Sequence, residues 1–496
     1  MKKTIKFGTD GWRGIIADDF IFSNVKIVAQ AVADYLKSQG KAGMPGGKDG
    51  ALSAKSRCLV PKVVVGYDMR FLSEEFAMAV ARVLAGNGFR VVLSSCAVPS
   101  PALSYSVINE KADLGVMITA SHNPASYNGF KIKTRFGSSA DRDITDGLEK
   151  NLYKKEPVDS GDISIKDLMP AYIKKVKSMI DMDLLNDARL KIVFDPMHGT
   201  GIGLLEKILK NSRCKIISMR SQRDPYFGGL HPEPIGKYLQ DLCVQVKKNN
   251  ADIGLATDGD SDRIGVVDDK GKYLTPHHNF PLLLFYLADG KGMKGKVVQT
   301  VSLGYLSERI ALAYKLPFQE VPVGFKYIAR AMLSEDVLIG GEESGGFSWK
   351  GYIPERDGVL NSLLFLEMLA RKKKKLSHIL GAIEKRFGRS CFDRIDVKID
   401  RSLMGSDFKE RMTKSIVMHA PPRIASMNVR EVRSYDGVKF ILGREDVPAG
   451  EAWLLLRPSG TEPLIRIYAE ASCPENVKKI LKKGESLVAA ASQVKI

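Results

Sequence analysis

The chain has 496 residues, of which 44% are hydrophobic and 27% charged, and it carries a formal net charge of +18. This length exceeds what one ordinary core supports and predicts three or four domains. No apolar run approaches the roughly 20 residues that cross a bilayer, no secretory signal opens the chain, and the six cysteines are scattered, so we expect a cytoplasmic protein without a membrane span or a disulfide framework.

The first 340 residues alternate predicted strands with predicted helices. Apolar runs indicate buried strands, and apolar residues at helical spacing follow the first of them, ending at Gly86-Asn87-Gly88. Strands separated by helices require crossover connections, which favour largely parallel sheets with ligands at the carboxyl ends of the strands. The predicted strands are residues 62–66, 90–93, 114–118, 190–194, 215–217, 252–256, 264–267, 296–298 and 337–339.

The last hundred residues follow a different pattern. Residues 395–399 alternate with period two, three further apolar segments cover 437–442, 452–457 and 464–468, and a closing helix begins near Glu475. Clustered strands with helices beside them predict a smaller α+β domain. Between Gly40 and Arg57 the chain is rich in Gly, Ser and Lys, which predicts an exposed, mobile loop.

Three carboxylates alternate in Asp258-Gly259-Asp260-Ser261-Asp262-Arg263, between two predicted strands. Such concentrated negative charge repels itself unless a hard divalent cation with oxygen ligands neutralises it. An EF-hand needs Gly at its sixth position and Glu at its twelfth, and Arg263 and Asp269 occupy those positions here. The remaining alternative is an acidic, solvated turn.

A serine follows a buried strand in Thr119-Ala120-Ser121-His122-Asn123-Pro124. Its position suits a nucleophile or phosphoryl carrier, although the same residues are ordinary turn formers. Farther on, Arg457-Pro458-Ser459-Gly460-Thr461-Glu462-Pro463 and then Arg466 offer guanidiniums, hydroxyls and an accessible backbone for a phosphate dianion, or simply a hairpin turn. Two more polar loops surround Arg13, within residues 7–14, and Glu342 and Ser344, within residues 340–346.

In this order, the loops T-A-S-H-N-P, D-G-D-S-D-R, G-E-E-S-G-G and R-P-S-G-T-E-P resemble those of the α-D-phosphohexomutase family, which includes phosphoglucomutases and phosphomannomutases. The resemblance covers nearly the whole chain. It implies three consecutive α/β/α domains with mixed, mainly parallel sheets and a smaller C-terminal α+β domain around a central cleft. We expect these domains at residues 1–152, 153–272, 273–389 and 390–496.

The resemblance also implies roles for individual residues. Ser121 would be the phosphoserine, and an oxygen of its phosphoryl group would complete a Mg²⁺ site held by three aspartates. Lys131 would be the general acid/base, and nearby cations would lower its pKa towards neutrality. The other implied residues are Asp258, Asp260 and Asp262 as metal ligands; His122, Arg13 and Arg263 around the phosphoryl group; Glu342, Ser344 and Lys326 on the sugar; and Arg457, Ser459, Gly460, Thr461 and Arg466 on the non-reacting phosphate.

The expected reaction interconverts a hexose 1-phosphate and a hexose 6-phosphate through two transfers and a bound hexose 1,6-bisphosphate. Two positions depart from relatives: Gly346 and Tyr352 stand where family members have histidine, so the second catalytic group on the sugar side is open. Glu342-Glu343-Ser344 favours glucose, with mannose as a further substrate, over glucosamine, whose mutases usually have Gln in this loop. Phosphoglucosamine mutase is the nearest alternative.

The positive charge suggests a second class of protein, one that binds nucleic acid. Much of the excess lies in lysine runs such as residues 372–375, which are typical of a solvated helix face, and no zinc-finger or RNA-recognition motif is present. We therefore expect a phosphosugar as the partner, with neither nucleic acid nor membrane, and a monomer or homodimer.

Overall fold

The computed structural model describes residues 5–8, 10–39, 60–399, 407–447, 449–459 and 464–493. The predicted loop at residues 40–57 lies outside these ranges. The chain forms two compact units: unit 1 comprises Met1–Tyr273 and Gly346–Lys373, and unit 2 comprises Leu274–Gly345 and Lys374–Ile496. Within the described ranges, none of the helices combines the length and apolarity that a bilayer crossing demands.

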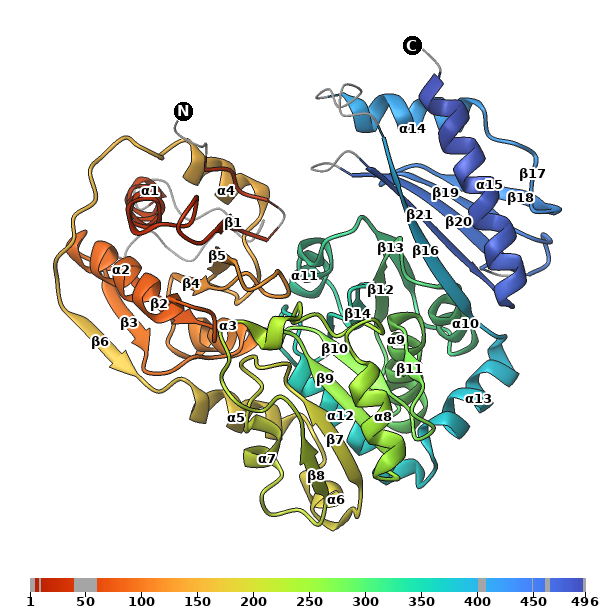
Figure 1. The fold of residues 1–496 in the computed structure, drawn as a ribbon, viewed down its shortest axis with the longest axis horizontal. Coiled ribbons are helices and arrows are strands. Elements are labelled where there is room, and N and C mark those ends of the chain that lie inside the picture. The colour runs from red at the N-terminus through yellow and green to blue at the C-terminus, as the bar shows by residue number, and fades with distance from the viewer. Residues whose placement is uncertain are drawn as a thin grey trace. The chain divides into compact units, whose positions relative to one another are not determined.

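Unit 1 begins with a six-stranded sheet in the order β1-β5-β4-β2-β3-β6 (Figure 1). Strands β4, β2, β3 and β6 run parallel, whereas β5 is antiparallel to both β4 and β1. Its elements are β1 Trp12–Ile15, β2 Lys62–Tyr67, β3 Arg90–Ser94, β4 Leu114–Ile118, β5 Tyr127–Thr134, β6 Ile163–Lys166, α1 Phe22–Gln39, α2 Ser73–Gly86, α3 Ser100–Asn109 and α4 Arg142–Glu149.

The centre of this sheet explains why its strands read as continuous apolar runs. Val63, Val64 and Val65 of β2 are fully buried, because helices cover both faces of a parallel sheet. β-Branched side chains suit this pleated, doubly covered position. The parallel strands of this sheet confirm the predicted segments 62–66, 90–93 and 114–118.

A second sheet of unit 1 has the order β11-β10-β9-β7-β8. β7 pairs in parallel with β8 and β9, and β10 turns back antiparallel to β9. Helix α12 packs against β9 and β10. The elements of this region are α5 Met169–Ser178, α6 Met182–Asp187, β7 Lys191–Asp195, α7 Leu204–Ile208, β8 Lys215–Ser218, η1 Phe227–Gly229, α8 Gln240–Lys248, β9 Ile253–Thr257, β10 Ile264–Val267, β11 Tyr273–Leu274, β15 Phe347–Trp349 and α12 Gly358–Lys372.

Unit 2 combines a parallel sheet with a C-terminal antiparallel one. In the first, β12 lies between β13 and β14 and is parallel to both. Its elements are α9 Pro276–Phe285, η2 Tyr286–Gly290, β12 Lys296–Thr300, α10 Tyr305–Ala313, β13 Phe318–Val321, α11 Phe325–Ser334, β14 Val337–Gly341 and α13 Leu376–Phe387.

The C-terminal sheet has the order β16-β21-β20-β19-β18-β17, and each neighbouring pair is antiparallel. Helices α14 and α15 pack on it, and their apolar side chains join one core with the strands. The predicted α+β character of this region is thus confirmed. The elements are β16 Cys391–Lys398, α14 Phe408–Met418, β17 Arg423–Ile424, β18 Met427–Arg433, β19 Val438–Leu442, β20 Ala452–Pro458, β21 Leu464–Ala471 and α15 Pro474–Gln493.

Candidate active site

The loop that follows β4 holds Ser121 in a left-handed backbone conformation, with φ at 53°. Residues other than glycine rarely adopt this conformation, and where they do the surrounding structure must hold them there. The Ser121 N–H donates to Thr119 Oγ1 at 2.8 Å. The Ser121 hydroxyl donates to Asp258 Oδ2 at 2.8 Å. The loop therefore aims the serine at the predicted carboxylate cluster.

Arg70 holds the backbone of the Ser121 loop in place. Its side chain is fully buried and forms an ion pair with Asp68, with 3.2 Å between Nε and Oδ2. Its two terminal nitrogens donate to four carbonyl oxygens of the loop, those of Ser121 at 2.6 Å, Asn123 at 2.7 Å, Pro124 at 2.8 Å and Tyr127 at 3.0 Å. A planar guanidinium can serve several acceptors in a fixed geometry, so Arg70 is a positioning residue for the serine loop.

Asp258, Asp260 and Asp262 occupy the turn between β9 and β10 and are fully buried. One oxygen from each carboxylate lies within 4.8 Å of the others. Burial and the two neighbouring carboxylates raise the pKa of Asp258 well above its ordinary value. Burial also raises the pKa of Asp262. Like charges held together out of water are costly without a compensating cation.

The free oxygens of this cluster fit a divalent cation. Oδ1 of Asp260 and Oδ1 of Asp262 are buried, and neither has a hydrogen-bond partner among the described residues. Hard cations such as Mg²⁺ prefer carboxylate oxygens as ligands. The three aspartates therefore meet the chemical requirement of the magnesium site that the sequence predicts.

Lys131 lies on β5, and its buried ammonium contacts three carboxylates. Its Nζ is 2.9 Å from Asp10 Oδ2, 3.0 Å from Asp260 Oδ2 and 3.6 Å from Asp262 Oδ2. Burial lowers the pKa of Lys131, but these three carboxylates outweigh burial and raise it. The predicted lowering of the Lys131 pKa is therefore wrong, because the charges nearest to the ammonium are negative.

The contact between Lys131 and Asp260 also lowers the pKa of Asp260. Burial raises the pKa of Asp260, but the Lys131 ammonium and a hydrogen bond from Ser100 Oγ lower it below its ordinary value. Asp260 is thus held ionised. An ionised carboxylate suits a metal ligand, because carboxylate ligands bind in the deprotonated form.

His122, Arg13 and Arg263 are the remaining residues predicted around the phosphoryl group. His122 Nδ1 is 3.4 Å from Ser121 Oγ, and burial, followed by Arg263 and Arg13, holds the pKa of His122 well below its ordinary value. Arg13 donates to Asn123 Oδ1 at 2.6 Å. Arg263 Nη1 donates to Glu233 Oε1 at 3.3 Å. The guanidiniums of Arg13 and Arg263 supply positive charge of the kind that a phosphoserine needs.

Sequence analysis missed Arg356, which reaches this site from the segment before α12. Arg356 Nη2 donates to Asp262 Oδ2 at 2.7 Å and to Asp10 Oδ2 at 3.2 Å. A Cβ atom on Gly346 would lie 2.2 Å from Arg356 Cδ. The absence of a side chain at Gly346 therefore makes room for Arg356.

Unit 2 carries the residues predicted to bind the sugar and its non-reacting phosphate. Arg457 on β20 and Arg466 on β21 are direct cross-strand partners. Arg457 Nε donates to Asp436 Oδ2 at 3.0 Å. Like charges placed opposite each other on neighbouring strands repel, and an anion between them relieves that repulsion. The arrangement suits a phosphate.

The other residues predicted to bind the sugar or its phosphate lie on separate segments of unit 2. Glu342 and Ser344 lie on the loop after β14, where the Gly345 N–H donates to the Glu342 carbonyl at 3.1 Å. Lys326 lies in the first turn of α11, with Nζ 5.3 Å from the Tyr327 ring centre. The Ser459 N–H donates to the Leu464 carbonyl at 3.0 Å. The predicted ligands Gly460 and Thr461 lie outside the described residues.

Two groups of predicted residues thus emerge. The structure brings Ser121, His122, Lys131, Arg13, Arg263 and the three aspartates together within unit 1, and it places the sugar and phosphate residues in unit 2. A serine aimed at buried carboxylates, with arginines around it and no hydrolase nucleophile elbow, suits metal-assisted transfer of a phosphoryl group. These features are typical of a phosphotransferase.

Comparison with known proteins identifies the family. Four models of phosphoglucomutase/phosphomannomutase match in order: α/β/α domain I at residues 4–159, domain II at 170–271, domain III at 275–387 and the C-terminal domain at 420–483. The chain belongs to the phosphoglucomutase/phosphomannomutase family of α-D-phosphohexomutases. The four-domain architecture is that of the family, whereas the boundaries predicted from the sequence stay a prediction.

Individual relatives carry different names. A phosphoglucomutase/phosphomannomutase of Thermococcus kodakarensis is 28% identical and aligns with 97% of this chain and 98% of its own length. A phosphoglucosamine/phosphogalactosamine mutase of Sulfurisphaera tokodaii is 29% identical, with 95% and 96% covered. The crystal structure of a proposed phosphomannomutase from Thermus thermophilus is 32% identical and superposes with a TM-score of 0.84 over 99% of this chain and 100% of that one. None of these similarities supports a nucleic-acid-binding protein.

Proposed function

We propose that the enzyme interconverts hexose 1-phosphate and hexose 6-phosphate, with glucose as the preferred sugar and mannose as a second substrate. The observation that carries this proposal is the 2.8 Å contact between Ser121 Oγ and Asp258 Oδ2, because it joins a phosphoryl-carrying hydroxyl to a buried site suited to a cation. In this proposal Ser121 is the phosphoserine and a hexose 1,6-bisphosphate is the bound intermediate.

In the first transfer, a sugar hydroxyl attacks the phosphorus of phosphoserine. The bond from the sugar oxygen to phosphorus forms as the bond from Ser121 Oγ to phosphorus breaks, the hydroxyl gives up its proton to an enzyme base, and Ser121 Oγ regains one. The bisphosphate turns round, and the reverse step returns its other phosphoryl group to Ser121. Atoms and charge balance over the cycle.

The residues of unit 1 stabilise the transferring group. Asp258, Asp260 and Asp262 would hold Mg²⁺, which when bound supplies electrostatic stabilisation to the phosphoryl oxygens. Arg13 and Arg263 add fixed positive charge, and neutral His122 lies within reach of Ser121 Oγ. Lys131, kept protonated by its three carboxylates, is better suited to giving a proton than to taking one until a neighbouring charge changes.

The residues of unit 2 bind the part of the substrate that does not react. Arg457 and Arg466 would hold the second phosphate between neighbouring strands, together with Ser459, Gly460 and Thr461. Glu342, Ser344 and Lys326 would contact sugar hydroxyls. A phosphate bound at a fixed point allows either end of the bisphosphate to be presented to Ser121 in turn.

A second candidate function is phosphoglucosamine mutase, which the name of the Sulfurisphaera tokodaii relative favours. Against it stands the acidic Glu342-Glu343-Ser344 loop. Turnover of glucose 1-phosphate, mannose 1-phosphate and glucosamine 1-phosphate, each at the same enzyme and Mg²⁺ concentration, distinguishes the two. We expect the highest kcat/KM with glucose 1-phosphate, and conversion of glucosamine 1-phosphate alone would refute the sugar assignment.

A further inference from the structure

Asp436 is a buried carboxylate of unit 2 that contacts the candidate phosphate site without belonging to it. It lies in the turn between β18 and β19, and 3% of its side chain is exposed. Its Oδ2 atom accepts from Arg457 Nε at 3.0 Å and from the Val323 N–H at 2.9 Å. Its Oδ1 atom accepts from Lys409 Nζ at 2.5 Å. Three donors, on β20, before α11 and on α14, therefore fix this carboxylate in place.

The turn that carries Asp436 is anchored by the residues on both sides of it. Glu320 on β13 accepts from Lys439 Nζ at 2.5 Å and from Tyr435 Oη at 3.0 Å, and it also forms an ion pair with Arg433. The side chains of Glu320 and Lys439 are buried. A buried polar network whose members are all paired makes the surrounding structure rigid. The turn therefore presents Asp436 in one defined position.

The backbone of this turn lies directly against Arg457. Gly437 follows Asp436 in the chain and has φ at 88°. A Cβ atom on Gly437 would lie 2.5 Å from the Leu456 carbonyl oxygen and 2.9 Å from Arg457 Cα. Glycine permits both this backbone conformation and this close approach. The approach brings the carboxylate of Asp436 next to the side chain of Arg457.

The contact with Asp436 uses one edge of the Arg457 guanidinium. Asp436 accepts the Nε–H, and the described residues offer no hydrogen-bond acceptor to Nη1 or Nη2 of Arg457. Because a guanidinium is planar and its N–H groups have fixed directions, holding Nε also sets the direction of the two Nη groups. Burial raises the pKa of Asp436, but Arg457 and hydrogen bonds from Lys409 and Val323 lower it below its ordinary value. The carboxylate therefore stays ionised at neutral pH.

The charge of Asp436 and its position act on phosphate binding in opposite directions. A carboxylate next to a phosphate site repels the phosphate, whereas a carboxylate that holds an arginine in the correct direction favours binding. We propose that Asp436 is a positioning residue for the non-reacting phosphate of the substrate and acts by directing the Nη groups of Arg457 towards it. This inference rests on the proposed function, which assigns that phosphate to Arg457 and Arg466. It predicts that loss of the carboxylate weakens binding, although a repulsive charge is removed.

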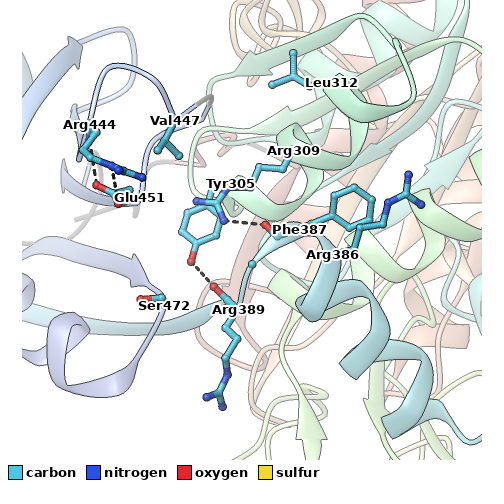
Figure 2. Close-up of a pocket in the computed structure, with 11 residues that line it drawn as sticks. Tyr305, Arg309, Leu312, Arg386, Phe387, Arg389, Arg444, Val447, Glu451 and Ser472 are labelled. Carbon is cyan, nitrogen blue, oxygen red and sulfur yellow. Dashed lines mark hydrogen bonds and ion pairs between the residues drawn. The ribbon is translucent and has the colours of Figure 1, made fainter.

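Another contact of the C-terminal sheet within unit 2 provides a control. It lies at a pocket of about 490 Å³, where Arg309 and Tyr305 of α10 lie across from the connection between β19 and β20 (Figure 2). Arg309 donates to the Gly450 carbonyl in that connection at 2.5 Å. Neither Asp436 nor Arg457 lines the pocket. Substitution of Arg309 therefore removes a contact between α10 and the C-terminal sheet without involving Arg457.

Calorimetric titration with glucose 1-phosphate tests the proposal, and a full chain carrying Ser121→Ala is the parent because it binds without turnover. We expect Asp436→Ala to raise the Kd about 10-fold. Asp436→Asn can keep an oxygen acceptor for Arg457 and Val323, so its Kd should rise less than about threefold. Combined with Arg457→Ala, Asp436→Ala should change the Kd less than about twofold further, because Asp436 acts through Arg457.

Two control variants separate positioning from other effects. Arg309→Ala removes the contact at α10, and Asp446→Ala removes a carboxylate whose side chain is 74% exposed. Both should leave the Kd within about twofold of the parent, because neither residue contacts Arg457. Thermal melting of every variant checks that it is folded.

Unchanged or tighter binding by Asp436→Ala would overturn the proposal, because charge repulsion would then be the larger effect. Equal weakening by Arg309→Ala, or equally weak binding by Asp436→Asn and Asp436→Ala, would also overturn it. If Arg457→Ala weakens binding and Asp436→Ala does not, this inference fails and the phosphate site of the proposed function stands. If Arg457→Ala itself leaves the Kd unchanged, the phosphate assignment and this inference both fail.

Discussion

The two sites that the proposed reaction needs are built in different ways. In unit 1, Ser121, Lys131 and three aspartates are buried to 1% exposure or less, and each charge is held by named partners. In unit 2, two residues proposed to bind phosphate, Arg457 and Arg466, lie opposite each other on adjacent antiparallel strands. In the proposed reaction, the chemistry on phosphorus would take place in a preorganised, buried site, and the phosphate that must bind in two orientations would meet a simpler electrostatic surface.

The largest effect we expect comes from the carboxylate cluster. Asp260→Asn removes the charge of a carboxylate whose Oδ1 atom has no hydrogen-bond partner among the described residues. Mg²⁺ binding and metal-dependent turnover should therefore fall by about 1,000-fold or more. Calorimetry with Mg²⁺ reports binding independently of activity. Asp187→Asn, at an exposed position, is the matched control and should change neither quantity. Full activity of Asp260→Asn in chelator would count against the metal site.

The phosphate residues of unit 2 should show a different kinetic signature. Arg457→Ala removes a guanidinium that faces Arg466 across the strands, so we expect KM for the phosphosugar to rise about 10- to 100-fold with a smaller change in kcat. Steady-state kinetics measure both. Arg394→Ala on β16 of the same sheet, where the side chain is exposed, should leave KM unchanged. A kcat loss without a KM change would contradict the binding role.

Substitution of Arg70 tests whether the conformation of the Ser121 loop depends on the hydrogen bonds that Arg70 donates. Arg70→Lys keeps the charge but cannot reach four carbonyls from one nitrogen, so the loop at Ser121 should lose order. We expect kcat to fall about 10- to 100-fold while Mg²⁺ binding at the aspartates is retained. The exposed Arg142→Lys is the control. If phosphorylation of Ser121 and turnover are unchanged, the positioning role is wrong.

Gly346 gives the smallest of these effects. In Gly346→Ala the added Cβ meets Arg356 Cδ at 2.2 Å, and Arg356 must move away from Asp262. We expect about 1–3 kcal/mol loss in the free energy of unfolding, measured by urea titration. Gly381→Ala, where a Cβ meets nothing within 4 Å inside α13, should be neutral or stabilising by up to about 1 kcal/mol. Equal results for both glycines would remove the steric argument.

Local sequence patterns predicted the structural features that depend on residues close to one another in the chain. The valine run of β2 predicted a buried strand, because consecutive apolar residues indicate burial. The alternating carboxylates of residues 258–262 predicted a cation site, because all three ligands lie within five residues. Arg70 and Arg356 were not readable, because their partners lie far from them in the sequence. The Lys131 pKa was predicted in the wrong direction for the same reason: the distance to Asp10 is a property of β5 and the N-terminal loop together.

The family resemblance supplied more of the candidate site than spacing alone. Residue patterns alone favoured an ordinary turn for the Ser121 loop, and they left a phosphate site and a hairpin turn as equal interpretations of the Arg457 loop. The family resemblance, which rests on the order of four motifs, implied that these loops and the aspartates belong to one catalytic site. The structure adds the physical reason for the first pairing, a hydrogen bond between positions 137 residues apart.

Intact-mass measurement of the purified chain after incubation with glucose 1,6-bisphosphate and Mg²⁺ tests the central claim most directly. We predict that the wild-type chain gains one phosphoryl group, that the group maps to Ser121 by peptide sequencing, and that Ser121→Ala gains none and has no turnover. Stable phosphorylation of another residue, or full turnover by Ser121→Ala, would contradict the account.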